Sequence, residues 1–190
     1  MVSDTRDTIL QVARRLFVRQ GYTATSTRQI AQEAGIGKAT VYHHFKDKQT
    51  IVLALMERDI EATRPEVAAV RVEPDLRRRI QMIVEGNLRF YSDSGDILQI
   101  IQREVQDGAT RVQTEYLACR RELSVLIEET LKQGSEQGLF RSLDPSEGAR
   151  LLLMMIEGTF AITYLAGEQP ETPEKAAATI IDAFFRVIEK

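Results

Sequence analysis

Residues 25–48 read TSTRQIAQEAGIGKATVYHHFKDK, and this stretch predicts two short helices joined by a tight turn. Ser26 offers a side-chain oxygen that can cap the start of the first helix. Gly35 can adopt the left-handed conformation that ends a helix, and Ile36 is a single apolar residue suited to fill the angle between two helices. A second helix is then expected over residues 38–45. The stretch therefore predicts a helix-turn-helix unit.

The two predicted helices divide their residues between a buried side and an exposed side. The expected buried residues are Ala31, Ala34, Ile36, Val41 and Phe45. The residues left outside are cations, hydroxyls and aromatic rings, namely Arg28, Lys38, Thr40, Tyr42, His43, His44, Lys46 and Lys48. Such a face suits the phosphate backbone and the base edges of a nucleic acid.

The flanking residues extend this unit at both ends. Residues 5–20 place apolar side chains three and four positions apart, which predicts an amphipathic helix that packs on the helix pair. These three helices form a predicted head over residues 1–47. Residues 48–64 then predict a linking helix, the first part of a body that comprises residues 48–190. Prolines in residues 65–74 are expected to end that helix and form a joint.

The rest of the body is predicted to be entirely helical. Apolar residues recur at spacings of three and four in the segments 75–92, 96–106, 109–134, 145–166 and 173–189. Gly, Pro, Ser and Asp separate these segments, and no strand-like alternation occurs between them. The predicted fold class is therefore all-α, with an N-terminal three-helix helix-turn-helix head and a C-terminal helical domain.

Charge is unevenly distributed along the chain, whose formal net charge is −3. Residues 1–50 hold 8 lysines and arginines against 4 acidic residues, whereas the remainder holds 17 against 24. A basic head on an acidic body fits a localised contact with phosphate. Chance also produces such an imbalance over fifty residues, so charge supports a nucleic-acid-binding head without establishing it.

The order IAQEAGIGKATVYHHFKDK, placed after one amphipathic helix, resembles the helix-turn-helix of the TetR (tetracycline-repressor-like) family of bacterial transcription regulators. The resemblance extends from Thr8 to about Leu55, with looser matches at residues 138–145 and 157–160. It implies sequence-specific DNA binding and repression that a small-molecule effector relieves. The implied mechanism is a displacement of the fourth helix that changes the spacing of two heads in a homodimer.

By the same resemblance, nine residues of the head face a DNA duplex: Thr27, Arg28, Lys38, Ala39, Thr40, Tyr42, His43, His44 and Lys48. Arg and Lys can bond a guanine edge, and Ala can contact a thymine methyl group. The expected base contacts are therefore Arg28, Lys38, Ala39 and Tyr42, while the other residues contact the backbone. The implied partners are a palindromic double-stranded operator, a second copy of this chain and an effector of unknown identity.

The body holds large apolar side chains beside polar groups that can orient a ligand in an apolar pocket. The candidate ligand-binding residues are Met82, Asn87, Phe90, Arg103, Tyr116, Met154, Glu157 and Tyr164. Ordinary core packing is the alternative interpretation of each, and it is the more common role for any single apolar residue.

The last two predicted helices, 145–166 and 173–189, carry more apolar surface than one protomer needs to bury. The apolar residues of the final helix are Ala176, Ala177, Ile180, Ile181, Phe184, Phe185 and Ile188. Gly148 and Gly158 in the preceding segment allow close approach of helices. The expectation is a homodimer in which these helices form an intermolecular four-helix bundle.

Other classes of protein are less compatible with the sequence. The body has no histidine and no glycine-rich phosphate loop, so we expect no enzymatic activity and no cofactor. Adjacent His43 and His44 point to different sides of one helix and Cys119 is the single cysteine, so we expect no metal site. No apolar run reaches bilayer-spanning length, and the expected location is the cytoplasm. The alternative function is that of a helical adaptor with nonspecific nucleic-acid binding and no effector.

Overall fold

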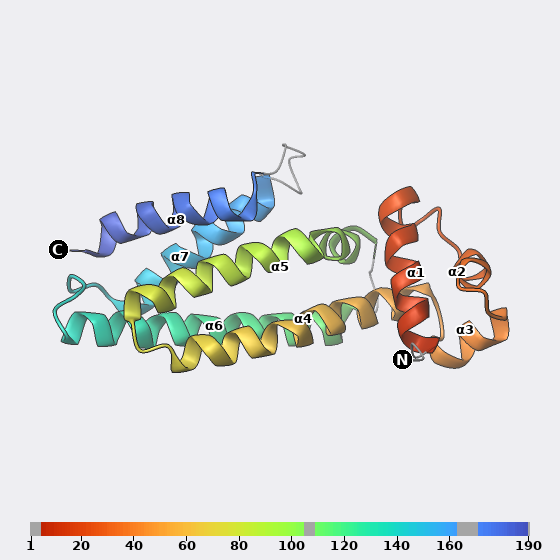
Figure 1. Cartoon of the computed structure of the whole chain (residues 1–190), viewed down its shortest axis with the longest axis horizontal. Helices are drawn as coiled ribbons and strands as arrows, with labels where there is room; N and C mark the ends of the chain where they lie inside the picture. The colour runs from red at the N-terminus through yellow and green to blue at the C-terminus, as the bar shows by residue number, and fades with distance from the viewer. Residues whose placement is uncertain (1–4, 105–108, 163–170, 190) are drawn as a thin grey trace. The chain divides into compact units, whose positions relative to one another are not determined.

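The computed structural model describes residues 5–104, 109–162 and 171–189. Within these residues the chain forms eight helices and no strand, which confirms the all-α prediction (Figure 1). The helices are α1 Thr5–Gln20, α2 Thr27–Glu33, α3 Lys38–His44, α4 Lys48–Val72, α5 Leu76–Glu104, α6 Ala109–Glu136, α7 Pro145–Phe160 and α8 Pro173–Ile188. None of the described helices is long and apolar enough to cross a membrane.

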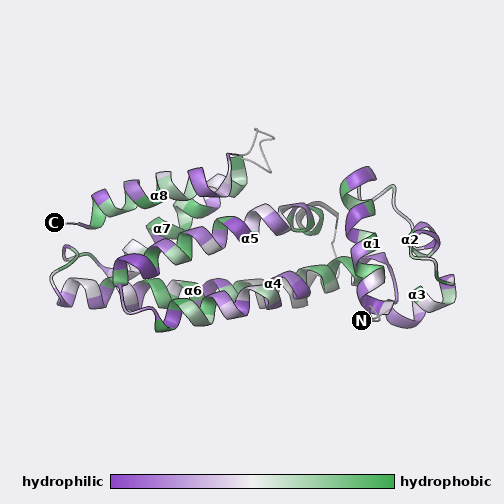
Figure 2. Ribbon diagram, in the orientation of Figure 1, coloured by the Kyte–Doolittle hydropathy of each residue, from purple (hydrophilic) through white to green (hydrophobic). Residues whose placement is uncertain are grey.

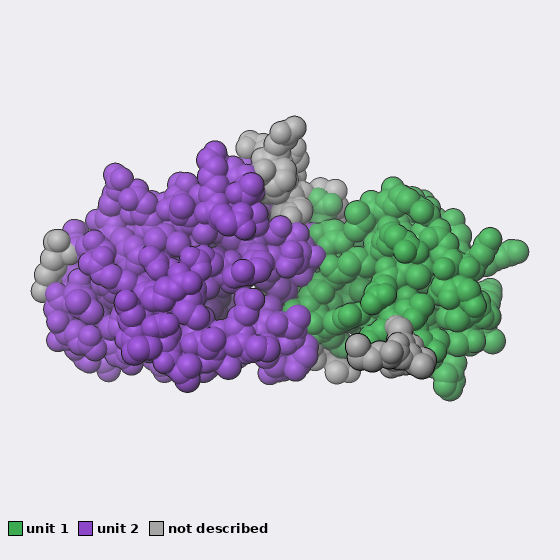
Figure 3. All heavy atoms as spheres, in the orientation of Figure 1, with its two compact units in different colours: residues 1–59, 96–115 green, residues 60–95, 116–190 purple. Residues whose placement is uncertain are grey.

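The chain divides into two compact units (Figure 3). The first comprises residues 1–59 and 96–115, and the second comprises residues 60–95 and 116–190. The first unit contains the predicted head and also takes in the first half of α4 and the end of α5. The helix α4 therefore contributes residues to both units.

The head is built on the apolar face of α1. The buried residues of this face are Ile9, Leu10, Val12, Ala13, Leu16 and Phe17. α1 contacts α2, and α2 contacts α3, which bury Ile30, Ala31 and Val41. Two residues expected to be buried, Ala34 and Ile36, are only half-buried. The core of the head thus depends more on α1 than on the turn between the two short helices.

The linking helix is longer than predicted. α4 continues through Pro65 to Val72, so the predicted helix end at residue 64 is wrong. The predicted joint at residues 65–74 is confined to its last part, because the non-helical connection comprises residues 73–75. A proline inside a helix removes one backbone hydrogen bond and crowds the preceding turn. Pro65 is exposed, and the residues around it are mostly good helix formers, so the helix continues past it.

α5 is one continuous helix, although the sequence predicts the two segments 75–92 and 96–106. Ser94 and Gly95 lie inside this helix and are buried. A glycine in a helix costs only about 1 kcal/mol relative to alanine. Burial of neighbouring apolar residues such as Ile97, which is fully buried, outweighs that cost.

α7 and α8 contact each other in the second unit, and α7 is rich in hydrophobic residues (Figure 2). Part of the apolar set predicted for the dimer interface is buried within the protomer, namely Ala176, Ala177, Ile180, Phe184 and Ile188. One stripe of α7 remains exposed or half-buried in the described structure, and it comprises Leu151, Met154, Met155 and Gly158, with Ile162 continuing it just after the helix end. These positions are three or four residues apart, so they share one side of the helix.

Candidate nucleic-acid interface and ligand cavity

Local hydrogen bonds hold the helix-turn-helix together. Ser26 Oγ accepts a bond from the Gln29 backbone N–H at 3.2 Å, and Gln29 Oε1 accepts one from the Ser26 N–H at 2.9 Å. This reciprocal capping box satisfies two free donors at the start of α2. Gly35 has a φ of 66°, and the Ile36 N–H donates to the Ala31 carbonyl at 3.0 Å. The bonds fix the direction in which the chain leaves α2 for α3.

Most of the residues expected to face DNA lie on the outside of α2 and α3. Arg28, Lys38, Ala39, Tyr42 and His43 are exposed. The half-buried members of the set are Thr27, Thr40, His44 and Lys48, the last at the start of α4. Positions 38 and 42, 39 and 42, and 39 and 43 are three or four residues apart, so these four positions share one face of α3. α3 therefore presents a cation, an aromatic ring, an imidazole and a small apolar side chain to solvent.

Tyr42 is held in place across the two short helices. Its hydroxyl lies 3.1 Å from Thr27 Oγ1 on α2, within hydrogen-bonding distance. The Lys38 ammonium lies 5.4 Å from the centre of the Tyr42 ring, one turn earlier on α3. These contacts order a side chain that is still 46% exposed. An ordered, exposed tyrosine loses little conformational entropy when it docks on a duplex.

The first turn of α4 is capped by Asp47. Asp47 Oδ1 accepts hydrogen bonds from the Thr50 backbone N–H and from Thr50 Oγ1, both at 2.8 Å. The bonds from Thr50 hold the pKa of the Asp47 carboxyl below its ordinary value. The stabilisation is therefore fully present above the pKa that Asp47 has in the unfolded chain, and it is lost as pH falls through the lowered pKa.

Lys48, which is expected to contact DNA, also clamps the loop between α1 and α2. Its ammonium donates to the carbonyl of Tyr22 at 2.5 Å and to the carbonyl of Thr25 at 2.8 Å. It also lies 4.1 Å from the centre of the Tyr22 ring. The first residue of α4 is thereby bonded to the loop that precedes α2. A phosphate contact by Lys48 stays a prediction, and the structure adds a role inside the head.

Replacing Lys48 by methionine should lower the stability of the head before any DNA is added. Hydrogen bonds to a charged group contribute about 1.5–3 kcal/mol, and the half-buried site reduces this to about 1 kcal/mol. The measurement is the free energy of unfolding in denaturant, with Lys46→Met as the control, because Lys46 is exposed. If both variants unfold like the wild type, Lys48 is not a clamp.

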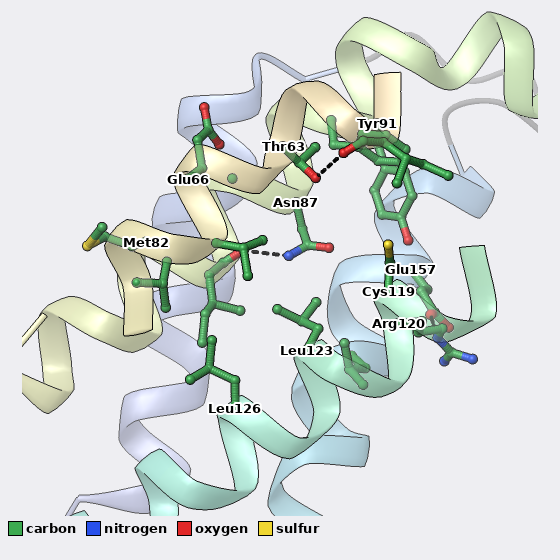
Figure 4. A pocket seen from close by; sticks show the side chains of 17 residues that line it. Thr63, Glu66, Met82, Asn87, Tyr91, Cys119, Arg120, Leu123, Leu126 and Glu157 are labelled. Carbon is green, nitrogen blue, oxygen red and sulfur yellow. Dashed lines mark hydrogen bonds and ion pairs between the residues drawn. The ribbon is translucent and has the colours of Figure 1, made fainter. Parts of the chain in front are cut away.

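A cavity of about 100 Å³ lies in the second unit between four helices (Figure 4). Its walls come from α4, α5, α6 and α7. Most of the lining is apolar, and the apolar residues are Ile60, Val67, Val70, Met82, Ile83, Phe90, Leu123, Leu126 and Leu153. A concave, mostly apolar site with a few polar groups is the usual form of a small-molecule site.

The polar groups of the cavity converge from different helices. The Asn87 amide nitrogen donates to the Ile83 carbonyl at 2.8 Å, and its amide oxygen is turned away from that bond (Figure 4). The Thr63 hydroxyl donates to the Ile60 carbonyl at 2.7 Å. The Tyr91 hydroxyl points toward the side of the cavity where Cys119 lies (Figure 4). Two of the four walls, α4 and α5, thus carry uncharged polar groups that can orient a ligand.

Two carboxylates and one guanidinium also line the cavity. Glu157 on α7 forms an ion pair with Arg120 on α6, with 2.5 Å between Oε1 and Nε. Glu66 on α4 lies at the rim, and its side chain is 51% exposed. Its nearest cation is Arg89, at 3.8 Å. At neutral pH the charged lining residues therefore include one more carboxylate than cations.

The predicted ligand-binding residues fall into three groups. Met82, Asn87, Phe90 and Glu157 line the cavity. Met154 is 53% exposed and is not among the lining residues, because its side of α7 faces away from the apolar interior. The side chains of Arg103, Tyr116 and Tyr164 lie outside the described residues. The sequence did not single out the cavity wall on α4, although its positions 60, 63, 67 and 70 have helical spacing.

Two family models match most of the chain. The model described as bacterial regulatory proteins of the tetR family matches residues 9–55. The model described as the tetracyclin repressor-like C-terminal domain matches residues 73–188. A relative in Bacillus subtilis, the HTH-type transcriptional regulator YvkB, is 32% identical over 159 residues, which cover 82% of this chain and 81% of YvkB.

Solved structures share the fold over nearly the whole chain. A protein from Saccharomonospora viridis, in complex with choline, is 26% identical, has a TM-score of 0.82 and is covered over 99% of both chains. AibR, in complex with isovaleryl coenzyme A and operator DNA, is 24% identical with a TM-score of 0.70, over 95% of this chain and 97% of AibR. At that identity the likeness to AibR concerns the fold alone.

Proposed function

Because this chain belongs to the TetR family of bacterial regulatory proteins, we propose that it is a repressor that a small molecule releases from DNA. The family defines the broader function, that of a DNA-binding transcriptional regulator. In the proposal a homodimer binds a palindromic operator in the cytoplasm. An effector that enters the cavity of the second unit then lowers the affinity for that operator.

The exposed face of α3 is the observation that carries the proposal. It combines Lys38, Ala39, Tyr42 and His43 on one side of α3, and the left-handed Gly35 turns the chain from α2 toward this helix. A recognition helix contacts base edges in the major groove with a few side chains of this kind. Arg28 on α2 lies outside this face and adds a further exposed cation.

Dimerisation is proposed through α7 and α8. The exposed stripe of α7 includes Met154, which is 53% exposed, and Gly158. On α8, Ile181 and Phe185 are only half-buried by the other residues of the protomer. A second copy related by a two-fold axis would cover these apolar residues with the same residues of its own.

Control by an effector is proposed to run through α4, because this helix belongs to both the head and the cavity. At the head, Asp59 forms an ion pair with Arg14 of α1. In the cavity wall, α4 contributes residues between Ile60 and Val70. Pro65 removes one hydrogen bond from the helix within that wall, which makes bending there easier. A ligand that binds better to one position of α4 would shift the population of head positions.

Known complexes support an effector and an operator on one fold. The protein from S. viridis holds choline, and AibR holds an acyl coenzyme A together with operator DNA. The present chain offers both a cavity and an exposed recognition helix. In the proposal the cavity binds the effector and α3 binds the operator.

Selection of DNA from a random pool tests the proposed operator. We expect the enriched fragments to contain two inverted half-sites whose centres lie about 34–36 Å apart, or a multiple of that distance, because two heads must meet the same side of the duplex. Enrichment of an isolated half-site, or of no sequence at all, would contradict the proposal.

A further inference from the structure

We infer that the cavity selects a small organic cation, such as a quaternary or tertiary ammonium ion, and that the Arg120–Glu157 pair tunes its affinity. The inference rests on the proposed ligand-responsive function, because it concerns the same cavity. It adds the chemical class of the effector and the residues that discriminate for it.

The walls of the cavity suit a cation that carries an apolar body. Phe90 and Tyr91 line it from α5, and the Tyr91 ring lies 4.9 Å from the ring of Phe160, centre to centre. Aromatic faces attract alkylammonium ions through the ring quadrupole, most strongly where water is excluded. The apolar remainder of the lining accommodates methyl or methylene groups. A volume of about 100 Å³ is below the usual range for drug-sized ligands, so a compact head group fits best.

Two polar groups of the cavity offer acceptor oxygens to a ligand. Asn87 uses one of its two amide N–H groups on the Ile83 carbonyl, and its amide oxygen can accept a hydrogen bond. Thr63 gives its proton to the Ile60 carbonyl and leaves its oxygen as an acceptor. These acceptors favour a ligand with a positive charge or with donor groups, and they disfavour a carboxylate.

The charged residues that line the cavity also favour a cationic ligand. Among the described lining residues, Glu66 and Glu157 are anionic and Arg120 is the sole cation, with no lysine or histidine. Glu66 is half-exposed and paired with Arg89 at 3.8 Å, so Glu157 is the carboxylate that a ligand meets inside the cavity, where it repels an anion and attracts a cation. Arg120 Nε lies 2.5 Å from Glu157 Oε1 and neutralises part of the charge of this carboxylate. In the wild type Glu157 therefore attracts a cationic ligand less strongly than it would without Arg120.

The two members of the pair should therefore have opposite effects on the affinity for a cation. Arg120→Gln leaves Glu157 unbalanced and should strengthen the binding of a cation by roughly tenfold. Glu157→Gln leaves Arg120 unbalanced and should weaken that binding by roughly tenfold. If the pair were only structural, both variants would loosen the cavity, and both would shift the affinity in the same direction.

Three probes of similar shape separate charge from size. They are (3-hydroxypropyl)trimethylammonium, its neutral carbon counterpart 4,4-dimethyl-1-pentanol, and the anion 4,4-dimethylpentanoate. Calorimetric titration of the full-length wild-type protein should show the strongest binding for the cation, weaker binding for the alcohol and the weakest for the anion. The alcohol should bind both variants about as it binds the wild type, so it reports whether the cavity is intact.

Each outcome of the titration counts for or against the inference. Equal binding of the alcohol and the cation would overturn it, as would tighter binding of the anion, shifts of the same sign in both variants, or no binding of any probe at millimolar concentration. The same samples are tested for release of the selected DNA duplex. Cation binding with the expected signs but without release would leave the inference standing and refute the proposed effector response. Release of the duplex by the neutral alcohol at the same concentration as the cation would overturn the inference and support the proposed effector response.

Discussion

A Gly158→Leu variant is expected to become monomeric and to lose operator affinity by about ten-thousandfold or more, while the protomer stays folded. Among the described residues, a Cβ built on Gly158 meets no atom within 4 Å, so the new side chain has room in the protomer. Leucine also favours a helix more than glycine does. The added side chain should therefore collide only with a second copy that packs against α7.

The loss of affinity follows from the loss of one half-site. Specific protein–DNA complexes have dissociation constants of about 10⁻⁸ to 10⁻¹¹ M, which correspond to roughly 11–15 kcal/mol. A single head would retain about half of this free energy, which gives a loss of about 5 kcal/mol or more. Sedimentation velocity measures the mass, and anisotropy of a labelled duplex measures the affinity.

Ala68→Leu is the matched control for Gly158→Leu. It adds the same side chain at an exposed helical position of the second unit, on α4 and outside α7 and α8. The control should stay dimeric and should bind the operator as the wild type does. A Gly158→Leu protein that is dimeric and keeps full affinity would refute an interface through α7.

Lys38→Ala and Tyr42→Ala should each reduce the preference for the operator over a scrambled duplex. A good side-chain contact with a base edge discriminates by about 1–3 kcal/mol. A dimer makes each contact twice, so we expect a loss of about 2–6 kcal/mol in specific binding. Tyr42→Ala also removes the hydroxyl that lies beside Thr27, which loosens the link between α2 and α3.

The measurement is the ratio of affinities for the selected and the scrambled duplex. Lys46→Ala serves as the control, because Lys46 is an exposed cation after α3. A dimer loses two phosphate contacts in this variant, which should weaken both duplexes alike and lower the salt slope by about two. If Lys38→Ala and Tyr42→Ala also weaken both duplexes alike, α3 does not contact base edges.

The elements of the head could be predicted from sequence because their signals are local. Helix α1 has the predicted bounds of residues 5–20, and α2 and α3 begin close to the predicted positions. Ser26 and Gly35 mark one helix start and one helix end through bonds and backbone angles within a few residues. Ile30 is fully buried but was absent from the predicted buried set. Its burial depends on how α2 packs in the head, which no local rule specifies.

The longer helices departed from prediction where packing outweighed local preference. Pro65 and Gly95 are both helix-breaking residues by propensity, and both lie inside helices. Gly95 is buried, so tertiary contacts compensate for its flexibility, whereas Pro65 is exposed on the outside of α4. Propensity is a weak guide in such cases because it counts only the neighbours along the chain.

The candidate sites were predictable only in part, since both depend on contacts between distant residues. The clamp by Lys48 reaches carbonyls 23 and 26 residues earlier in the chain. The cavity combines side chains of four helices, and composition indicated polar and apolar candidates without their arrangement. Asn87 and Glu157 line the cavity, and their contact with a ligand stays a prediction. Thr63 and Arg120 acquire their importance only from their partners Ile60 and Glu157.

The affinity of the full-length protein for a selected and a scrambled duplex, measured over a range of salt concentrations, tests the central claim most directly. The claim is that the exposed face of α3 reads a DNA sequence. We expect the selected duplex to bind at least about 10³-fold more tightly. Both affinities should fall linearly with the logarithm of the salt concentration. Equal affinities for the two duplexes at every salt concentration would contradict the account and would favour a nonspecific helical adaptor.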